Sequence, residues 1–315
     1  MICKQNRTQA VVLLTGVSLL SQIPAAFAQV GQLGQNNTAV TYANPDPVGP
    51  AACAPVSVAN GLTYLDNLYG GNVFSSNPNS YATVNSLAQA MGTAYDSVSW
   101  VGGTSFANEV AGLNQYLATS VNPGYNASIV GGQYVSTSAD GGTVLGNVTG
   151  LPANVVNAVP SVSALSSDLN AHDAVEAWIQ WGTYNPGLTV FTPLGGLHSV
   201  TLTAISGSSI SFVDPWGDGT TSATESASTI TTGIQTSVDG YLYMPSQFPS
   251  DEVGHEIYDG TDAGNGVHYY GRLVTDLAES VSPVPEPSTY LTGALMLIPL
   301  GTGALRRFRA SRQES

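Results

Sequence analysis

Residues 51–65 read AACAPVSVANGLTYL and place one cysteine, Cys53, directly before a helical pattern. Apolar side chains recur at intervals of four, three and four residues, which is the spacing of one helix face. These side chains are Val58, Leu62, Leu65 and Tyr69. Pro55 suits a first helical turn, and Gly70 with Gly71 forms a stop signal. The sequence therefore predicts a helix over 55–69 with Cys53 at or just before its N-terminus.

Cys53 is expected to lack a disulfide partner after export. The other cysteine, Cys3, lies in an N-terminal segment that we expect to be removed. An odd cysteine in a secreted chain indicates an intermolecular bridge or a reactive thiol. The free N–H groups and the dipole at a helix N-terminus stabilise a thiolate and lower its pKa from about 8.5. The simpler alternative is a buried cysteine that only fills space.

The segment 193–218, PLGGLHSVTLTAISGSSISFVDPWGD, predicts a β-hairpin. Apolar and polar residues alternate before a turn at 206–208, and apolar residues continue on one face after it. A turn centred near Ser206 places His198 opposite Asp214 at the open end of the hairpin. An imidazole and a carboxylate would then lie side by side.

Cys53, His198 and Asp214 are the residues that we predict to be catalytic. A thiol nucleophile needs a base that takes its proton and later returns it to the leaving amine. A carboxylate beside that base fixes the tautomer of the imidazole and stabilises its positive charge. Each residue also has an ordinary explanation, since His198 suits a strand and Asp214 suits the turn in DPWGD.

The chain resembles papain-like cysteine peptidases over roughly 40–245, and among them the bacteriocin-leader (double-glycine) peptidases and their secreted relatives. The nucleophile helix of the family is similar to CAPVSVANGLTYL, and its histidine strand is similar to GGLHSVTLTAI. The family's acid segment is similar to VDPWGD. The helix before the histidine strand looks like SALSSDLNAHDAVEAWIQWG. The separation of 145 residues between Cys53 and His198 falls within the roughly 130–150 residues of papain-type enzymes.

The resemblance implies an α+β papain-like fold over residues 29–245, in which the nucleophile helix packs on an antiparallel sheet. It implies Cys53 as the nucleophile, His198 as the base and Asp214 as the group that orients the imidazole. Peptide or protein substrates are expected, and no cofactor is needed.

One position departs from the family pattern. The family usually has a glutamine six residues before the cysteine, where its side chain completes the oxyanion hole, and this chain has Pro47 there. Loss of such a donor typically lowers kcat about 10²–10³-fold. Asn44 is the nearest amide and the candidate replacement. The alternative is an inactive descendant that binds the cell surface or the extracellular matrix.

The first 28 residues match a secretory signal peptide. Lys4 and Arg7 give a positive start, an apolar stretch covers 10–20, and the sequence Ala-Phe-Ala at 26–28 is a cleavage site. We therefore expect export through the inner membrane and removal of residues 1–28. A transmembrane anchor is the alternative, and the apolar stretch is short for that.

Residues 285–312 carry a second, three-part pattern. It consists of the triplet Pro285, Glu286 and Pro287, an apolar run of 16 residues over 290–305 and an arginine-rich tail. This resembles the PEP-CTERM sorting signal of Gram-negative, exopolysaccharide-forming bacteria. The resemblance implies a short transmembrane segment, recognition by an exosortase and release to the cell surface or matrix. The basic tail is expected to stay cytoplasmic, and an ordinary C-terminal anchor is the alternative.

The central part of the chain is strongly acidic. Six of the seven Lys and Arg residues lie in the two terminal segments, so Arg272 is the one that remains, against 19 Asp and Glu. A chain of this charge cannot form a basic patch, which excludes nucleic-acid binding. A surface of uncharged polar residues is compatible with an exopolysaccharide matrix.

Two weaker alternatives concern metals. Two sets of residues would offer metal ligands at helical spacing: His172, Asp173 and Glu176, and His255, Glu256 and Asp259. Neither set forms a known metal motif. The stretch DGTDAGNG at 259–266 holds oxygen ligands suited to calcium but lacks a full calcium-loop pattern.

Residues 246–284, which include this stretch, are expected to form an acidic extension and linker with an extra strand in GVHYYGRLV.

Overall fold

The computed structural model describes most of the central chain. The described residues are 28–41, 51–96, 101–137, 144–146, 148–185, 190–217, 222–237, 240–245 and 268–284. They form a mixed α+β fold with a large sheet and four helices. Residues 1–27 of the signal-peptide pattern and the whole pattern from 285 onward lie outside these residues, as do Asn44 and Pro47.

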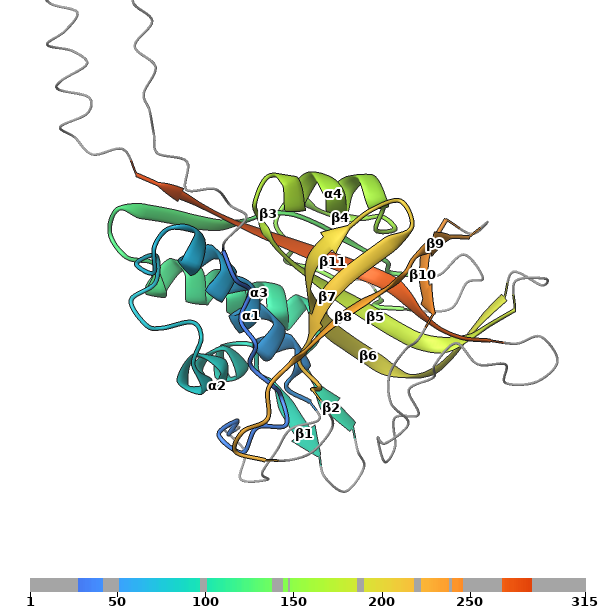
Figure 1. Cartoon of the computed structure of the whole chain (residues 1–315), viewed down its shortest axis with the longest axis horizontal. Coiled ribbons are helices and arrows are strands. Elements are labelled where there is room, and N and C mark those ends of the chain that lie inside the picture. The colour runs from blue at the N-terminus through green and yellow to red at the C-terminus, as the bar shows by residue number, and fades with distance from the viewer. Residues whose placement is uncertain are drawn as a thin grey trace, which may run out of the picture.

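Three helices gather at one side of the sheet (Figure 1). They are α1 (Cys53–Leu68), α2 (Tyr81–Ala90) and α3 (Phe106–Ser120), and a small sheet of β1 (Ala94–Asp96) and β2 (Val101–Gly103) lies beside them. The predicted helix is confirmed, and it begins at Cys53 itself. Val58, Leu62 and Leu65 are buried, and Gly70 and Gly71 adopt the left-handed conformation that follows a helix end.

Among the described residues, the large sheet has nine strands in the order β4-β3-β11-β5-β6-β7-β8, with β10 paired to both β11 and β9. The strands are β3 (Tyr125–Tyr134), β4 (Val155–Asn157), β5 (Ala174–Asn185), β6 (Val190–Ile205), β7 (Ser209–Asp214), β8 (Ser228–Gly233), β9 (Gln235–Thr236), β10 (Leu242–Pro245) and β11 (His268–Pro283). All pairs are antiparallel except β3 with β4, which is parallel. The expected antiparallel sheet is therefore a mixed one.

The strand pairings also connect the β8 end of the sheet back to β11. β9 continues β8 after Ile234, β9 pairs with β10, and β10 pairs with β11. This half of the sheet curls around an apolar interior that includes Val175, Leu202, Phe212, Ile234 and Met244. β11 lies between β3 and β5, so the strand at the end of the acidic segment 246–284 is longer and more central than GVHYYGRLV indicates.

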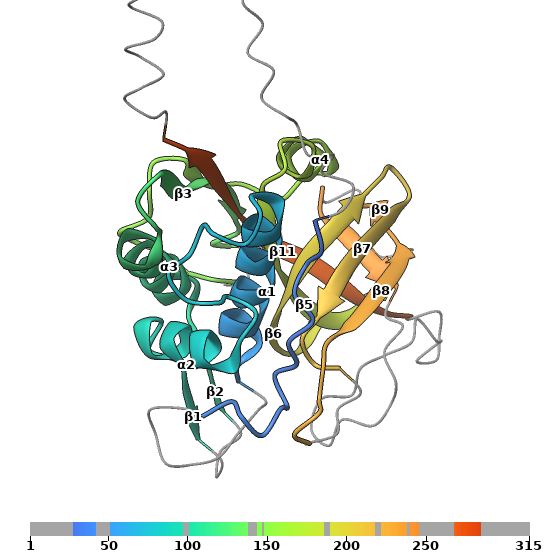
Figure 2. The same ribbon diagram turned by 60° about the vertical axis from the view of Figure 1, so that its left-hand side comes forward.

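The helix α1 packs between the sheet and the other two large helices, as Figure 2 shows. It contacts the face of β5 that carries Ala174 and Trp178. A fourth helix, α4 (Val162–Asn170), packs through Leu165 on the opposite face, which carries Val175 and Ala177. Both faces of β5 are therefore buried.

The prediction of a helix over SALSSDLNAHDAVEAWIQWG is correct only for the first half of that stretch. α4 ends at Asn170, His172 adopts a left-handed backbone conformation with φ of 67°, and β5 begins at Ala174. The second half is a strand because its alternate residues face two different cores. No helix among the described residues is long and apolar enough to cross a membrane.

Candidate active site

Cys53 is the first residue of α1, and its side chain is half-buried. Ala52 at the N-cap has no side chain to accept from the first N–H groups. Those donors therefore stay available to an anion in front of the helix. The backbone N–H groups of Ala54 and Ser199 both donate to the sulfur.

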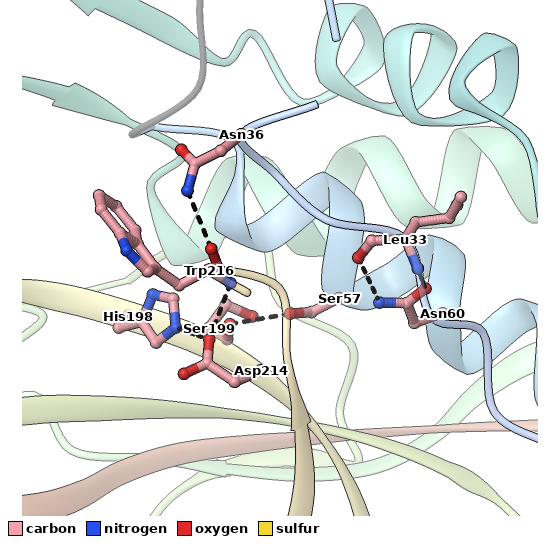
Figure 3. A network of polar contacts seen from close by, with 8 residues as sticks. All are labelled: Leu33, Asn36, Ser57, Asn60, His198, Ser199, Asp214 and Trp216. Atoms are coloured by element: carbon pink, nitrogen blue, oxygen red, sulfur yellow. Dashed lines mark hydrogen bonds and ion pairs between the residues drawn. The ribbon is translucent and has the colours of Figure 1, made fainter. Parts of the chain in front are cut away.

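His198 and Asp214 are in direct contact. The His198 Nε2 lies 2.7 Å from Asp214 Oδ1, and the two side chains are 13% and 2% exposed. The same Oδ1 accepts a hydrogen bond of 2.9 Å from the Trp216 backbone N–H, as seen in Figure 3. Asp214 is therefore held from two sides, and its contact with Nε2 leaves Nδ1 as the ring nitrogen for the hydrogen bond with Cys53.

The predicted register of the hairpin is wrong, although the predicted contact exists. Ile205 pairs with Ile210 and Thr201 with Val213, so paired positions are shifted by two to three residues from the His198–Asp214 register. A bulge between Leu202 and Ala204 changes the register further. The two side chains meet beyond the last pair, because both lie at the open end of the hairpin.

The electrostatics of the site favour an ion pair. Burial raises the pKa of the Cys53 thiol, but the hydrogen bond and charge of His198, together with the backbone N–H groups of Ser199 and Ala54, bring that pKa below its usual value. Burial lowers the pKa of His198, whereas the charge and hydrogen bond of Asp214, aided by Cys53, raise it well above its usual value. The arrangement can hold a thiolate beside an imidazolium.

Two hydrogen bonds join α1 to β6. Ser57, one turn after Cys53, donates through Oγ to the Ser199 carbonyl at 2.8 Å, and its own carbonyl accepts from Thr201 Oγ1 at 2.8 Å. All three residues are at most 1% exposed. These bonds fix α1 against β6 next to the Cys53–His198 pair, and we refer to them as the Ser57 clamp.

The N-terminal segment 31–40 supports the acid side of the site. The Asn36 side chain donates to the Trp216 carbonyl at 2.9 Å, and the Gln35 N–H donates to the Pro215 carbonyl at 2.7 Å. Asn60 of α1 holds the same segment by bonds to the N–H and carbonyl of Leu33 (Figure 3). The sequence carries no signal for Gln35, Asn36 or Asn60. Ser57 is the exception, since it follows Cys53 by one helical turn.

The metal hypotheses receive no support from the described residues. His172, Asp173 and Glu176 do not share a helix, because they occupy the turn before β5 and the strand itself. No group of three His, Cys, Asp or Glu within the described ranges is arranged to hold a metal ion. His255, Glu256, Asp259 and the calcium candidate at 259–266 lie outside those ranges.

No protein-family model, curated protein or solved structure matches this chain. The resemblance to papain-like peptidases therefore stays a prediction that depends on the residues themselves. The same holds for the sorting signal, since Pro285, Glu286 and Pro287 lie outside the described residues.

Proposed function

We propose that this protein is an exported cysteine peptidase that cleaves or transfers peptide bonds. Cys53 is the nucleophile, His198 the general base and acid, and Asp214 the group that orients the imidazole. The observation that carries the proposal is the contact of His198 with both partners, Asp214 at 2.7 Å and the Cys53 thiol at the start of α1.

The proposed reaction begins from the thiolate–imidazolium pair. The Cys53 sulfur attacks the carbonyl carbon of a peptide bond, and the imidazolium of His198 gives its proton to the leaving amine. A water molecule, or an acceptor amine in a transfer reaction, then attacks the thioester while His198 takes its proton. The backbone N–H groups at the start of α1 are the proposed donors to the negative charge that develops, and Asn44 is the candidate side-chain donor.

Turnover of peptides tests this function. The purified exported protein is incubated with a library of fluorogenic peptides, next to Cys53→Ala and His198→Ala. We expect cleavage by the wild type and its loss in both variants, with His198→Ala lower by about 10²–10⁴-fold. Equal turnover in wild type and Cys53→Ala would overturn the proposal.

The proposed destination is the cell surface or the extracellular matrix. The pattern at 285–312 supports recognition by an exosortase, cleavage near Pro285, Glu286 and Pro287, and release of the domain from the membrane. In a host with an exosortase, replacement of Glu286 by Ala should leave the protein in the membrane fraction. Release of the variant at the wild-type rate would contradict this sorting.

An inactive binding protein of the matrix is the second candidate. Pro47 at the oxyanion position and the scarcity of charge favour it, as do exposed hydroxyl pairs on the sheet. Ser206 pairs with Ser209 at 2.9 Å and Ser211 with Thr231 at 2.7 Å. This candidate predicts an unreactive Cys53 together with co-sedimentation of the protein with purified exopolysaccharide.

A further inference from the structure

Three glutamate side chains meet inside the protein, beneath the nucleophile helix. Glu109 comes from α3, Glu176 from β5 and Glu279 from β11, and they are 0%, 1% and 1% exposed. Glu176 occupies the space that a side chain at Gly61 of α1 would fill. We call these three residues the carboxyl cluster. It links the helix that carries Cys53 to the centre of the sheet.

Within the described part of the chain, no cation lies against the carboxyl cluster. Arg272 is the one Lys or Arg among the described residues, and its guanidinium is engaged elsewhere. It donates to Gln180 Oε1 at 2.6 Å and lies over the rings of Phe191 and Tyr241. Ionised carboxylates buried without a cation are strongly unfavourable, so such groups take up protons instead.

Among the described residues, the groups near the cluster add negative charge or none. Glu176 and Glu279 contact each other through their carboxyls, and Asp173 lies within electrostatic reach of Glu279. Glu109 lies beside the Trp178 indole and within electrostatic reach of Glu176 and Cys53. Two carboxyls in contact cannot both ionise at low cost, so this pair shares at least one proton.

We propose that the carboxyl cluster is a proton-operated switch that keeps α1, and with it the Cys53–His198 pair, in place under acidic conditions and releases it as the pH rises. The part concerning Cys53 rests on the proposed peptidase function. The part concerning the fold does not.

The direction of the pH dependence follows from the burial of these groups. Burial raises the pKa of Glu176 to about 7 and those of Glu109 and Glu279 well above their usual value. A group with a raised folded-state pKa stabilises the fold fully below its unfolded pKa of about 4.3. That stabilisation is lost as the pH rises through the folded-state pKa. For Glu176 the loss takes place between about pH 4 and 7.

The switch also acts on the nucleophile through charge. Glu109 lies within electrostatic reach of Cys53, so an ionised Glu109 opposes the thiolate. When Glu109 is protonated, the thiolate–imidazolium pair has no competing charge from that side. The site is therefore set for catalysis at acidic pH.

Unfolding by urea between pH 5 and 8 tests the switch. We expect the folding equilibrium constant of the exported protein to fall with pH, by about tenfold per pH unit for each group that binds a proton in the folded state alone. His198 contributes with the same sign, since its folded-state pKa is also raised. The contribution of the cluster is therefore isolated by comparing the stability of the wild type with that of Glu109→Gln and of Glu279→Gln. Each variant has an uncharged glutamine at the replaced position at every pH.

The variants should lie closest to the wild type at pH 5 and exceed its stability by a growing margin toward pH 8. Asp66→Asn is the matched control, because it removes a carboxylate outside the cluster and keeps the acceptor for the Val73 N–H. Its curve should run parallel to that of the wild type. Two results would overturn the proposal. The first is a wild-type stability that stays level or rises from pH 5 to 8, which can be measured even if both variants fail to fold. The second is a pH dependence of the variants' stability that runs parallel to that of the wild type.

Alkylation of Cys53 by iodoacetamide separates the switch from the peptidase function. In Glu109→Gln the rate should match the wild type near pH 5 and exceed it several-fold at pH 8. Equal rates at both pH values would remove the link to Cys53. Absence of peptide turnover alongside this pH effect would reject the peptidase function and leave the switch standing.

Discussion

His198 and Asp214 lie in contact, Nε2 to Oδ1 at 2.7 Å, although the hairpin that carries them pairs neither residue with the other. The contact depends on the bulge in β6 and on the turn after Asp214, where the Trp216 N–H holds the carboxylate. The orientation of the imidazole therefore depends on the end of β7, and four substitutions test how the site is held.

Replacement of Asp214 by Ala removes the acceptor for His198 Nε2. Because the charge and hydrogen bond of Asp214 raise the pKa of His198, we expect that pKa to fall and the imidazolium to be lost at lower pH. Peptide turnover should drop by about 10²–10⁴-fold. The pKa is measured by NMR of the His198 ring, and an unchanged pKa would show that Asp214 does not set it.

Replacement of Ser57 by Ala breaks one bond of the Ser57 clamp. The buried Ser199 carbonyl loses a donor, which typically costs about 1–3 kcal/mol of unfolding free energy. If the clamp positions Cys53 against His198, kcat falls while KM changes little. Ser57→Thr keeps the hydroxyl and should restore kcat; recovery of stability without recovery of kcat would leave Ser57 with a structural role alone.

Replacement of Asn36 by Ala frees the Trp216 carbonyl on the acid side of the site. We expect a lower kcat, because Trp216 and Asp214 are held by one short turn. Asn67→Ala is the matched control, since Asn67 donates to the carbonyl of Gln29, just before the segment 31–40 and away from Trp216 and Asp214. Equal kcat losses in the two variants would assign Asn36 a general role in anchoring the segment.

Replacement of Gly61 by Ala tests how α1 lies on the carboxyl cluster. An alanine usually stabilises a helix interior by about 1 kcal/mol over glycine. Here a Cβ would collide with the Glu176 carboxyl, so we expect a loss of about 1–3 kcal/mol. Glu176→Ala should relieve much of this loss in the double variant, measured by urea unfolding. Additive effects in the two variants would mean that the side chains do not meet.

The sequence predicts the helix of Cys53 well, because α1 has one buried face with a period of 3.6 residues and clear signals at both ends. It fails for the segment 171–182, because β5 is buried on both faces and its apolar residues do not alternate. Val175 faces one core and Trp178 the other. The left-handed conformation of His172, which separates helix from strand, is not visible in the sequence pattern.

The contact of His198 with Asp214 is predictable from residue types, and its geometry is less so. Chemistry and spacing single out Cys53, His198 and Asp214 as candidates, whereas the register depends on a bulge that no local residue type indicates. The carboxyl cluster could not be predicted, since Glu109, Glu176 and Glu279 are far apart in sequence and each alone looks like a solvated charge. Their burial follows only from how α3, β5 and β11 meet.

The rate of Cys53 alkylation as a function of pH is the most direct test of the Cys53–His198 pair. It is measured with iodoacetamide on the wild type and on His198→Ala. We expect a fast reaction that persists below pH 7 in the wild type and is lost in the variant. A slow reaction in both proteins, rising only near pH 8.5 as for an ordinary thiol, would contradict a catalytic Cys53–His198 pair.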